Sequence, residues 1–386
     1  MSDKKPLKQF LMIPGPTPVP TRILAAMTHD MLGHRGPVFS KILGEVIEGL
    51  KWCYQTKNDL MVWPCSGTGV MEAAVVNTLS AGDKVIVCNT GEFGERFVKI
   101  NKAYGTNVDQ VKASAPGKTI NIDELDAKLA ADKNKEIKAV FAQHNETSTA
   151  VLNDIKRISE VVRKHGALMI VDSISGLLTS PLPADEWGLD VVLCGSQKAF
   201  MVPPGVAAMS MSARAWAACE VSKLPKFYWD AKVQKKFADK GQTYTTPPES
   251  IIFGMHEAIK MIQEEGLEGI YERHMMVTKA VRAGVRAAGC TLLADDACAS
   301  CAVTAIIPPD GIDGEKVRSE IRKFGVEVAP GQGDLKGKIF RIGHLGYVDK
   351  LELVATIGAL ELLFTQMGAK GIEIGKGPKA MLEMLA

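Results

Sequence analysis

The sequence lacks an excess of charge of either sign and lacks any long hydrophobic run. Its 386 residues include 46 Lys and Arg against 44 Asp and Glu, a formal net charge of +2. Nucleic-acid-binding chains usually carry a basic face or stripe, so this balance argues against that class. The longest apolar segments have the length of a strand, so none is expected to span a membrane. The start, MSDKKPLKQF, has no apolar core typical of a signal peptide, and we expect a cytoplasmic protein.

Cysteine patterns that bind zinc are also scarce. The eight cysteines are scattered, mostly in apolar stretches, as is typical of reduced core residues. Cys298 and Cys301 have CxxC spacing, but no second such pair and no nearby histidine accompanies them. We therefore expect no metal site, and we expect Cys301 to open a strand instead.

Two familiar nucleotide-binding signatures are incomplete. The stretch GTGVME (67–72) lacks the third glycine of the dinucleotide-binding fingerprint. The stretch PGKT (116–119) lacks the first glycine of a P-loop, because position 112 is lysine. A dinucleotide-dependent dehydrogenase and a P-loop nucleotide hydrolase are both disfavoured.

What the sequence does contain is an alternation of short apolar strands and helices. Helical patterns, such as 70–79, separate continuously apolar strands at 60–63, 84–88, 139–143, 167–172 and 191–195. Such runs are typical of a parallel sheet covered on both faces. Near 246–250 the pattern changes to long helices followed by a β/α mixture. We predict an α/β fold with an N-terminal arm (1–21), a large domain with a mostly parallel, doubly wound sheet (22–260) and a smaller α+β C-terminal domain (261–386).

One lysine is predicted to lie inside the large domain. Lys198 lies between two expected strands (190–195 and 205–212), and the apolar residues Phe200, Met201 and Val202 follow it closely. Asp172 ends the preceding expected strand, and in doubly wound sheets ligands bind at the carboxyl ends of the strands. The chain interval between them, one helix and one strand, can bring both side chains to the same edge. A lysine kept inside at such an edge serves chemistry that needs a neutral, nucleophilic amine.

A small-residue loop provides a third element. Ser66, Gly67, Thr68 and Gly69 follow an expected strand and begin a helix, which offers backbone N–H groups to a phosphate. A phosphate cradle, a carboxylate and a half-buried lysine are what pyridoxal 5′-phosphate (PLP) requires. The lysine forms the Schiff base, the aspartate pairs with the pyridine nitrogen, and the helix start holds the phosphate.

The chain resembles class V, fold-type I PLP-dependent aminotransferases of the alanine–glyoxylate and serine–glyoxylate group. The resemblance covers nearly the whole length through PGPTPVP, HRGP, SGTG, HNETSTA, DEWGLDV, GSQKAFMVPPG, YTTPP and FRIGHLG, in that family's order. It implies that Lys198 carries the cofactor and that Asp172 binds the pyridine nitrogen. It also implies contacts to the phosphate, to the ring hydroxyl and to the ring face from Thr68, Gly69, Val70, Gln197, Thr147 and Ile174.

The resemblance further implies a homodimer with shared active sites, because Thr246 would reach the phosphate of the neighbouring subunit. The sequence departs from the family at two positions. The ring-stacking residue is Phe93, where some relatives have tryptophan, and phenylalanine still offers a π face. Thr243 stands where the family has a phosphate-binding tyrosine, and Tyr244 follows one position later. Whether Tyr244 or Arg35 serves the partner's site is left open.

The expected activity is transfer of the amino group of serine or alanine to glyoxylate or pyruvate. Arg341 follows a strand pattern and precedes a glycine-containing turn. We expect Arg341 to bind the α-carboxylate of each substrate, because a guanidinium can form two parallel hydrogen bonds with a carboxylate. Two alternatives within the same fold remain, a pyridoxamine–pyruvate aminotransferase and a cysteine desulfurase-type lyase. A scaffold protein without activity is disfavoured, because the lysine, the aspartate and the phosphate loop are all present.

Overall fold

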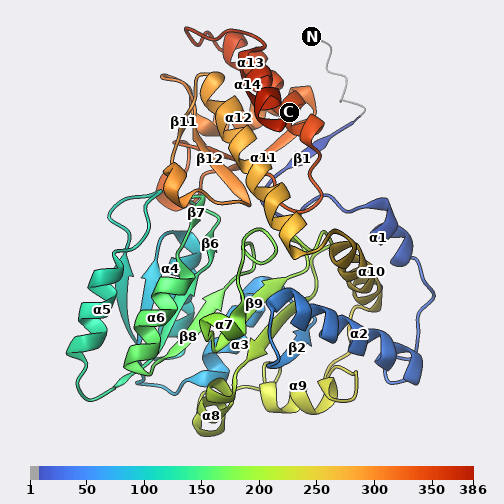
Figure 1. Ribbon diagram of the computed structural model, residues 1–386, viewed down its shortest axis with the longest axis vertical. Helices are drawn as coiled ribbons and strands as arrows, with labels where there is room; N and C mark the ends of the chain where they lie inside the picture. The colour runs from blue at the N-terminus through green and yellow to red at the C-terminus, as the bar shows by residue number, and fades with distance from the viewer. Residues whose placement is uncertain (1–7) are drawn as a thin grey trace.

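The computed structural model describes residues 8–386 as two large sheets with their own helices, stacked along the longest axis of the molecule, and a two-stranded hairpin (Figure 1). Residues 1–7 of the predicted arm lie outside the described residues. A seven-stranded sheet forms the large domain, and a five-stranded sheet forms the small domain. Within residues 8–386, no helix combines the length and the apolar character needed to cross a membrane.

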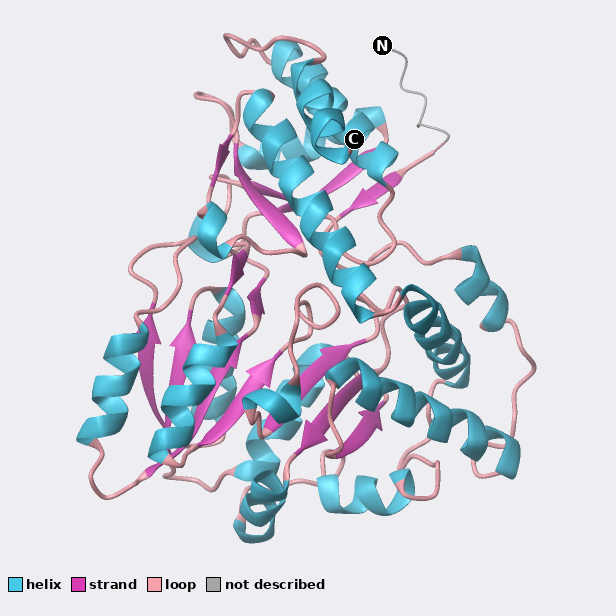
Figure 2. Ribbon diagram, in the orientation of Figure 1, coloured by secondary structure: helices cyan, strands magenta, loops and turns pink. Residues whose placement is uncertain are grey.

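The large sheet, whose strands are among those drawn in magenta in Figure 2, has the order β2-β10-β9-β8-β5-β3-β4. Neighbouring strands from β9 to β4 pair in parallel, whereas β10 runs antiparallel to both β9 and β2. The predicted mostly parallel sheet is confirmed. Its strands are β2 (Asp59–Trp63), β3 (Lys84–Asn89), β4 (Asn107–Lys112), β5 (Ile137–Gln143), β8 (Leu168–Asp172), β9 (Val191–Gly195) and β10 (Ala207–Met211).

Both faces of this sheet are buried, because successive side chains of a strand point to opposite sides. In β8, Met169 and Val171 belong to one hydrophobic core, and Leu168 and Ile170 belong to the other. The first core is covered by α1 (Thr21–Ala26), α2 (Pro37–Tyr54), α5 (Ile122–Ala131), α6 (Ile155–His165), α7 (Ala184–Trp187) and α10 (Glu249–Glu265). The second is covered by α3 (Gly67–Thr78), α4 (Glu92–Ala103), α8 (Ala213–Val221) and α9 (Ala231–Ala238).

The small domain is an α+β unit with the strand order β1-β13-β14-β12-β11. Its strands are β1 (Phe10–Met12), β11 (Thr291–Leu292), β12 (Val303–Ile307), β13 (Val326–Pro330) and β14 (Phe340–Gly343). Its helices are α11 (Leu267–Ala287), α12 (Gly314–Ile321), α13 (Lys350–Gln366) and α14 (Lys376–Leu385), with short 3₁₀ turns at Asp296–Cys298, Arg322–Phe324 and Gly333–Leu335. The predicted fold class is thereby confirmed.

The chain passes between the two domains in two places. β1 pairs in parallel with β13 of the small domain, and the chain then crosses to the large domain. Helix α11 follows α10 and runs up into the small domain (Figure 1). Residues of α10 such as Phe253 and Ile259 pack in the large-domain core. The predicted boundaries at 21/22 and 260/261 stay a prediction, and the second of them falls within α10.

Two local expectations were wrong by a few residues. Helix α3 begins at Gly67 and not at 70, because the glycines of SGTG adopt the first helical turn themselves. Strand β12 begins at Val303, so Cys301 lies before it. All eight cysteines are free.

Candidate active site

Lys198 lies in the loop between β9 and β10, close to the segment that crosses between the domains. Its side-chain Nζ donates to the carbonyl oxygen of Pro14 at 2.5 Å, and its own carbonyl accepts from the hydroxyl of Thr17 at 3.0 Å. A Cβ atom on Gly15, whose φ is +130°, would lie 2.6 Å from Nζ. Only glycine therefore fits where the N-terminal segment passes over the lysine.

The environment of Lys198 favours the neutral amine. Burial lowers its pKa to about 8, and the positive charges of Arg341 and Arg96 act in the same direction, while the carboxylate of Asp172 opposes them. A neutral amine is the nucleophilic form, so this environment suits covalent chemistry near neutral pH.

Asp172 is the last residue of β8 and is 4% exposed. One carboxylate oxygen accepts the backbone N–H of Ile174 at 2.9 Å. The pKa of Asp172 is raised to about 7: burial and, less strongly, the charge of Glu146 raise it, whereas the Ile174 hydrogen bond, Lys198 and Arg96 lower it. The carboxyl group is thus buried at a site where a cationic partner, such as a protonated ring nitrogen, would stabilise its charged form.

The start of helix α3 lies at the same edge of the sheet. Its N-cap residue, Ser66, makes no side-chain capping bond. A Cβ atom on Gly67 would lie 2.6 Å from Ile174, which therefore packs against the helix start. Gly69 donates its N–H to the Ser66 carbonyl and leaves no room for a side chain beside Trp229. Val70 is fully buried behind this turn.

Gln197 contributes a polar group without a partner. Its side-chain oxygen is buried and has no hydrogen-bond partner in the part of the chain that the structure describes. A buried amide of this kind is costly unless a ligand engages it. The helix start and this amide fit a phosphate, and the half-buried Lys198 and the buried Asp172 fit the two ends of the PLP ring system.

Sequence reasoning missed Arg96, which lies one helical turn after Phe93 on α4. Its guanidinium lies 4.6 Å from the centre of the Phe93 ring and donates to the hydroxyl of Thr68 at 2.9 Å. It thereby connects the predicted stacking residue with the predicted phosphate loop. The stretch GEFGERF contained the signal, because residues three apart share a helix face.

Arg341 lies within β14 and is 3% exposed. Its Nε donates to the Pro330 carbonyl at 2.9 Å, and one terminal nitrogen donates to the Thr147 carbonyl at 2.8 Å. The hydroxyl of Thr147 forms a 2.7 Å hydrogen bond with that of Ser175. Burial lowers the pKa of Arg341 to about 10, and Glu146 opposes that shift. The guanidinium is therefore fixed between the domains, within electrostatic reach of Lys198.

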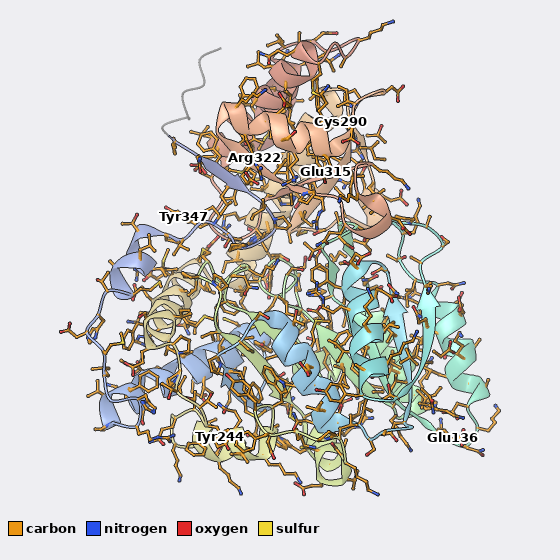
Figure 3. The ribbon with its side chains drawn as sticks, turned by 180° about the vertical axis from the view of Figure 1, so that it is seen from behind. Glu136, Tyr244, Cys290, Glu315, Arg322 and Tyr347 are labelled. Carbon is orange, nitrogen blue, oxygen red and sulfur yellow. The ribbon has the colours of Figure 1, made fainter. Side chains whose placement is uncertain are left out.

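Among the described residues, none of the three considered for the partner's site forms a hydrogen bond, ion pair or ring contact with Lys198, Asp172 or Arg341. Thr246 is exposed. Figure 3 places Tyr244 towards the end of the large domain that is remote from the small domain. Arg35 lies beside it, with one nitrogen 3.5 Å from the Tyr244 carbonyl and the guanidinium 5.1 Å from the Phe237 ring.

The fold and this site together define a PLP-dependent enzyme. Residues 10–335 match the model of the class-V aminotransferase family, and the chain belongs to that family. The predicted family and cofactor are confirmed, and the protein is an aminotransferase that uses PLP.

Several known proteins are similar over nearly their full length. The chain is 44% identical to the soluble hydrogenase, small subunit, of Synechococcus sp. (strain PCC 6716), covering 98% of this chain and 99% of that protein. It is 35% identical to the L-aspartate–glyoxylate aminotransferase of Paracoccus denitrificans, covering 97% and 95%. It is 34% identical to the serine–glyoxylate aminotransferase of Methylorubrum extorquens, covering 95% and 94%.

A solved structure supports the same family. The ureidoglycine–glyoxylate aminotransferase of Bacillus subtilis superposes with a TM-score of 0.91 at 30% identity, covering 100% of both chains. The names of these relatives describe different reactions, so the substrates of this chain are a matter for proposal.

The raised pKa of Asp172 predicts a stability effect in the cofactor-free protein. The carboxyl group of Asp172 has a pKa of about 7 in the folded protein and 3.8 in the unfolded chain. Its protonated form therefore favours the folded state below about pH 4, and this contribution to the free energy of unfolding is lost as the pH rises through 7. Each pKa unit corresponds to about 1.4 kcal/mol. Cofactor-free Asp172→Asn should therefore resist urea better than the wild type at pH 8, with the difference vanishing near pH 4.

The control is Asp126→Asn, an exposed position on α5, which should leave the pH dependence unchanged. With PLP bound, Asp172→Asn should lose most transamination, because a neutral amide cannot hold the ring nitrogen protonated. Equal stability of Asp172→Asn and wild type at both pH values would show that burial does not raise the pKa of Asp172.

Proposed function

We propose that the protein transfers the amino group of a small amino acid, serine or alanine, to glyoxylate or pyruvate in two half-reactions. The observation that carries this proposal is the position of Arg341, a buried guanidinium beside Lys198 that comes from the other domain. Amino acids and 2-oxo acids share an α-carboxylate, so one fixed guanidinium can orient both substrates. The names of the glyoxylate aminotransferases among the relatives support glyoxylate as the acceptor.

Each residue has a defined task in this proposal. PLP, when bound, supplies an electron sink for the electron pair left at the substrate Cα after its proton is removed. Lys198 would hold the cofactor, and its free amine would accept and return the proton at the substrate Cα. Asp172 keeps the ring nitrogen protonated, and Ser66–Val70 with Gln197 hold the phosphate. The Phe93 and Ile174 side chains enclose the ring, and Thr147 lies near its hydroxyl.

A cysteine desulfurase-type lyase is less well supported. Such an enzyme needs a reactive thiolate near the cofactor. Cys65 precedes the phosphate loop, and burial raises its pKa to about 12. A thiol with that pKa is almost entirely protonated at neutral pH and is a poor nucleophile.

We also propose that the active form is a homodimer in the cytoplasm, with Thr246 serving the partner's phosphate site. Thr246 is exposed in the single chain. Phe227, whose ring contacts that of Tyr244, is 76% exposed. Both exposures support a surface that a second copy covers. Full activity in a species that light scattering identifies as a monomer would contradict this proposal.

The substrate assignment is tested by steady-state rates. Serine, alanine, aspartate and pyridoxamine should each be supplied as donor with glyoxylate or pyruvate as acceptor. We expect the highest kcat/KM for serine or alanine with glyoxylate. A higher kcat/KM for aspartate or for pyridoxamine would refute the proposed donor class while leaving the enzyme an aminotransferase.

Arg341→Lys tests the carboxylate-binding role. Lysine keeps the charge but not the fork of two parallel donors, so we expect a loss of about 2–4 kcal/mol in kcat/KM for donor and acceptor alike. The absorbance of bound PLP should not change.

Arg282→Lys is the matched control, because Arg282 is also a buried small-domain arginine, held by Asp296 and the Ala294 carbonyl. Both variants should lose stability, but only Arg341→Lys should lose kcat/KM. If the two variants behave alike, Arg341 is structural and the carboxylate binds elsewhere.

A further inference from the structure

Helix α4 carries the predicted stacking residue Phe93 and Arg96, but its own N-cap residue makes no side-chain capping bond. Its N-cap residue is Gly91, which has no side chain to accept the first N–H groups. Four N–H groups at a helix start lack partners within the helix, and leaving them buried without partners is unfavourable. Another part of the chain must therefore satisfy them.

The acceptors come from the loop at β6 (Asn145–Glu146), some fifty residues later in the chain. One carboxylate oxygen of Glu146 accepts the N–H of Phe93 at 3.0 Å and the N–H of Gly94 at 3.1 Å. The hydroxyl oxygen of Ser148 accepts the N–H of Glu92 at 3.0 Å. Two side chains thus bind three successive N–H groups at the start of α4.

Glu146 and Ser148 also hold each other. The second carboxylate oxygen of Glu146 accepts the N–H of Ser148 at 3.0 Å and its hydroxyl at 2.6 Å. All of these bonds involve a buried carboxylate, since Glu146 is 0% exposed. A Cβ atom on Gly91 would lie 2.3 Å from the Ser148 hydroxyl and 2.7 Å from the Glu146 carboxyl carbon. The glycine therefore gives this pair the room it needs.

The location of the pair ties it to the active site. The β6–β7 hairpin, with β7 at Val151–Leu152, lies at the edge of the large domain that faces the small domain (Figure 1). Thr147, between Glu146 and Ser148, accepts the hydrogen bond of Arg341. A negative charge at a helix N-terminus is also stabilised by the helix dipole.

We propose that Glu146 is a positioning residue that, together with Ser148, fixes the first turn of α4 and thereby places the Phe93 ring and the Arg96 guanidinium against the cofactor site. This inference rests on the PLP site and not on the particular substrates. Glu146 touches neither reacting atoms nor substrate in this role. Its charge also acts on Asp172 and Arg341, raising the pKa of both groups.

Glu146→Gln is the informative substitution, because it keeps the size of the side chain. The two carboxylate oxygens of Glu146 accept two pairs of donors, the N–H groups of Phe93 and Gly94 and the N–H and O–H of Ser148. A glutamine amide has one acceptor oxygen and one NH₂ group, so one of these pairs would lie against the NH₂ group. We expect amide hydrogen exchange at 92–94 to accelerate at least tenfold in the cofactor-free protein, about the effect of losing one charged hydrogen bond. We expect the Kd for PLP to rise by about tenfold or more for the same reason. The visible circular dichroism of the bound cofactor should weaken, because that signal reports how the ring is held.

Asp190→Asn provides the matched control. Asp190 is also a buried carboxylate that accepts a backbone N–H, from Met169 at 2.9 Å, and a serine hydroxyl, from Ser212 at 2.7 Å. It precedes β9, at the opposite edge of the sheet from Lys198. Asp190→Asn should lower the melting temperature without changing the Kd for PLP or the dichroism.

Two results would overturn the proposal. One is Glu146→Gln with unchanged exchange at 92–94, and the other is faster exchange there with wild-type Kd and dichroism. If Glu146→Gln does not fold, Ser148→Ala serves instead, since it removes only the acceptor for Glu92. It should accelerate exchange at 92 and weaken the dichroism, and wild-type values for both would equally refute the proposal. Wild-type protein that binds no PLP would refute the cofactor site itself, and the exchange measurement would still test the cap.

Discussion

The removal of four charged side chains from water at one edge of the large sheet governs the chemistry of this protein. Lys198, Asp172, Glu146 and Arg341 lie where the two domains meet, and burial is the largest cause of the pKa shift of each one. Burial of an isolated charge costs several kcal/mol, so each group depends on the others and on the backbone. Electrostatic attraction offsets part of that cost between Asp172 and Lys198 and between Glu146 and Arg341.

The fold provides this edge through its covered sheet. Because helices bury both faces of the strands, the strand ends are the place where polar side chains can meet a ligand without leaving the structure. Asp172 ends β8, and Lys198 follows β9, its parallel neighbour. The small domain completes the site with Arg341, and the N-terminal segment at Pro14–Thr17 covers Lys198. Residues from four distant parts of the chain are thus held together by backbone carbonyls as much as by opposite charges.

Some parts of this arrangement were predictable from the sequence. Continuous apolar runs identified the central strands, and the chain position of Asp172 and Lys198 placed both at strand ends. The SGTG loop was recognised as a helix start, although α3 begins earlier than its apolar pattern does. Long-range contacts were not predictable in this way. Nothing in the spacing of HNETSTA indicates that Glu146 binds the start of α4, because that bond depends on tertiary structure. For the same reason β1 could not be assigned to the small-domain sheet.

The reactivity of Lys198 follows from its burial and from the charge of Arg341, and it is measurable without any substrate. The rate at which the cofactor-free protein captures PLP covalently should be followed between pH 6 and 10, with Lys198→Ala measuring the background from other lysines. The structure predicts a rate that rises to a plateau with a midpoint near pH 8, the pKa expected for Lys198. A rate that keeps rising through pH 10, as for an ordinary lysine with a pKa of 10.5, would contradict the electrostatic account of the site.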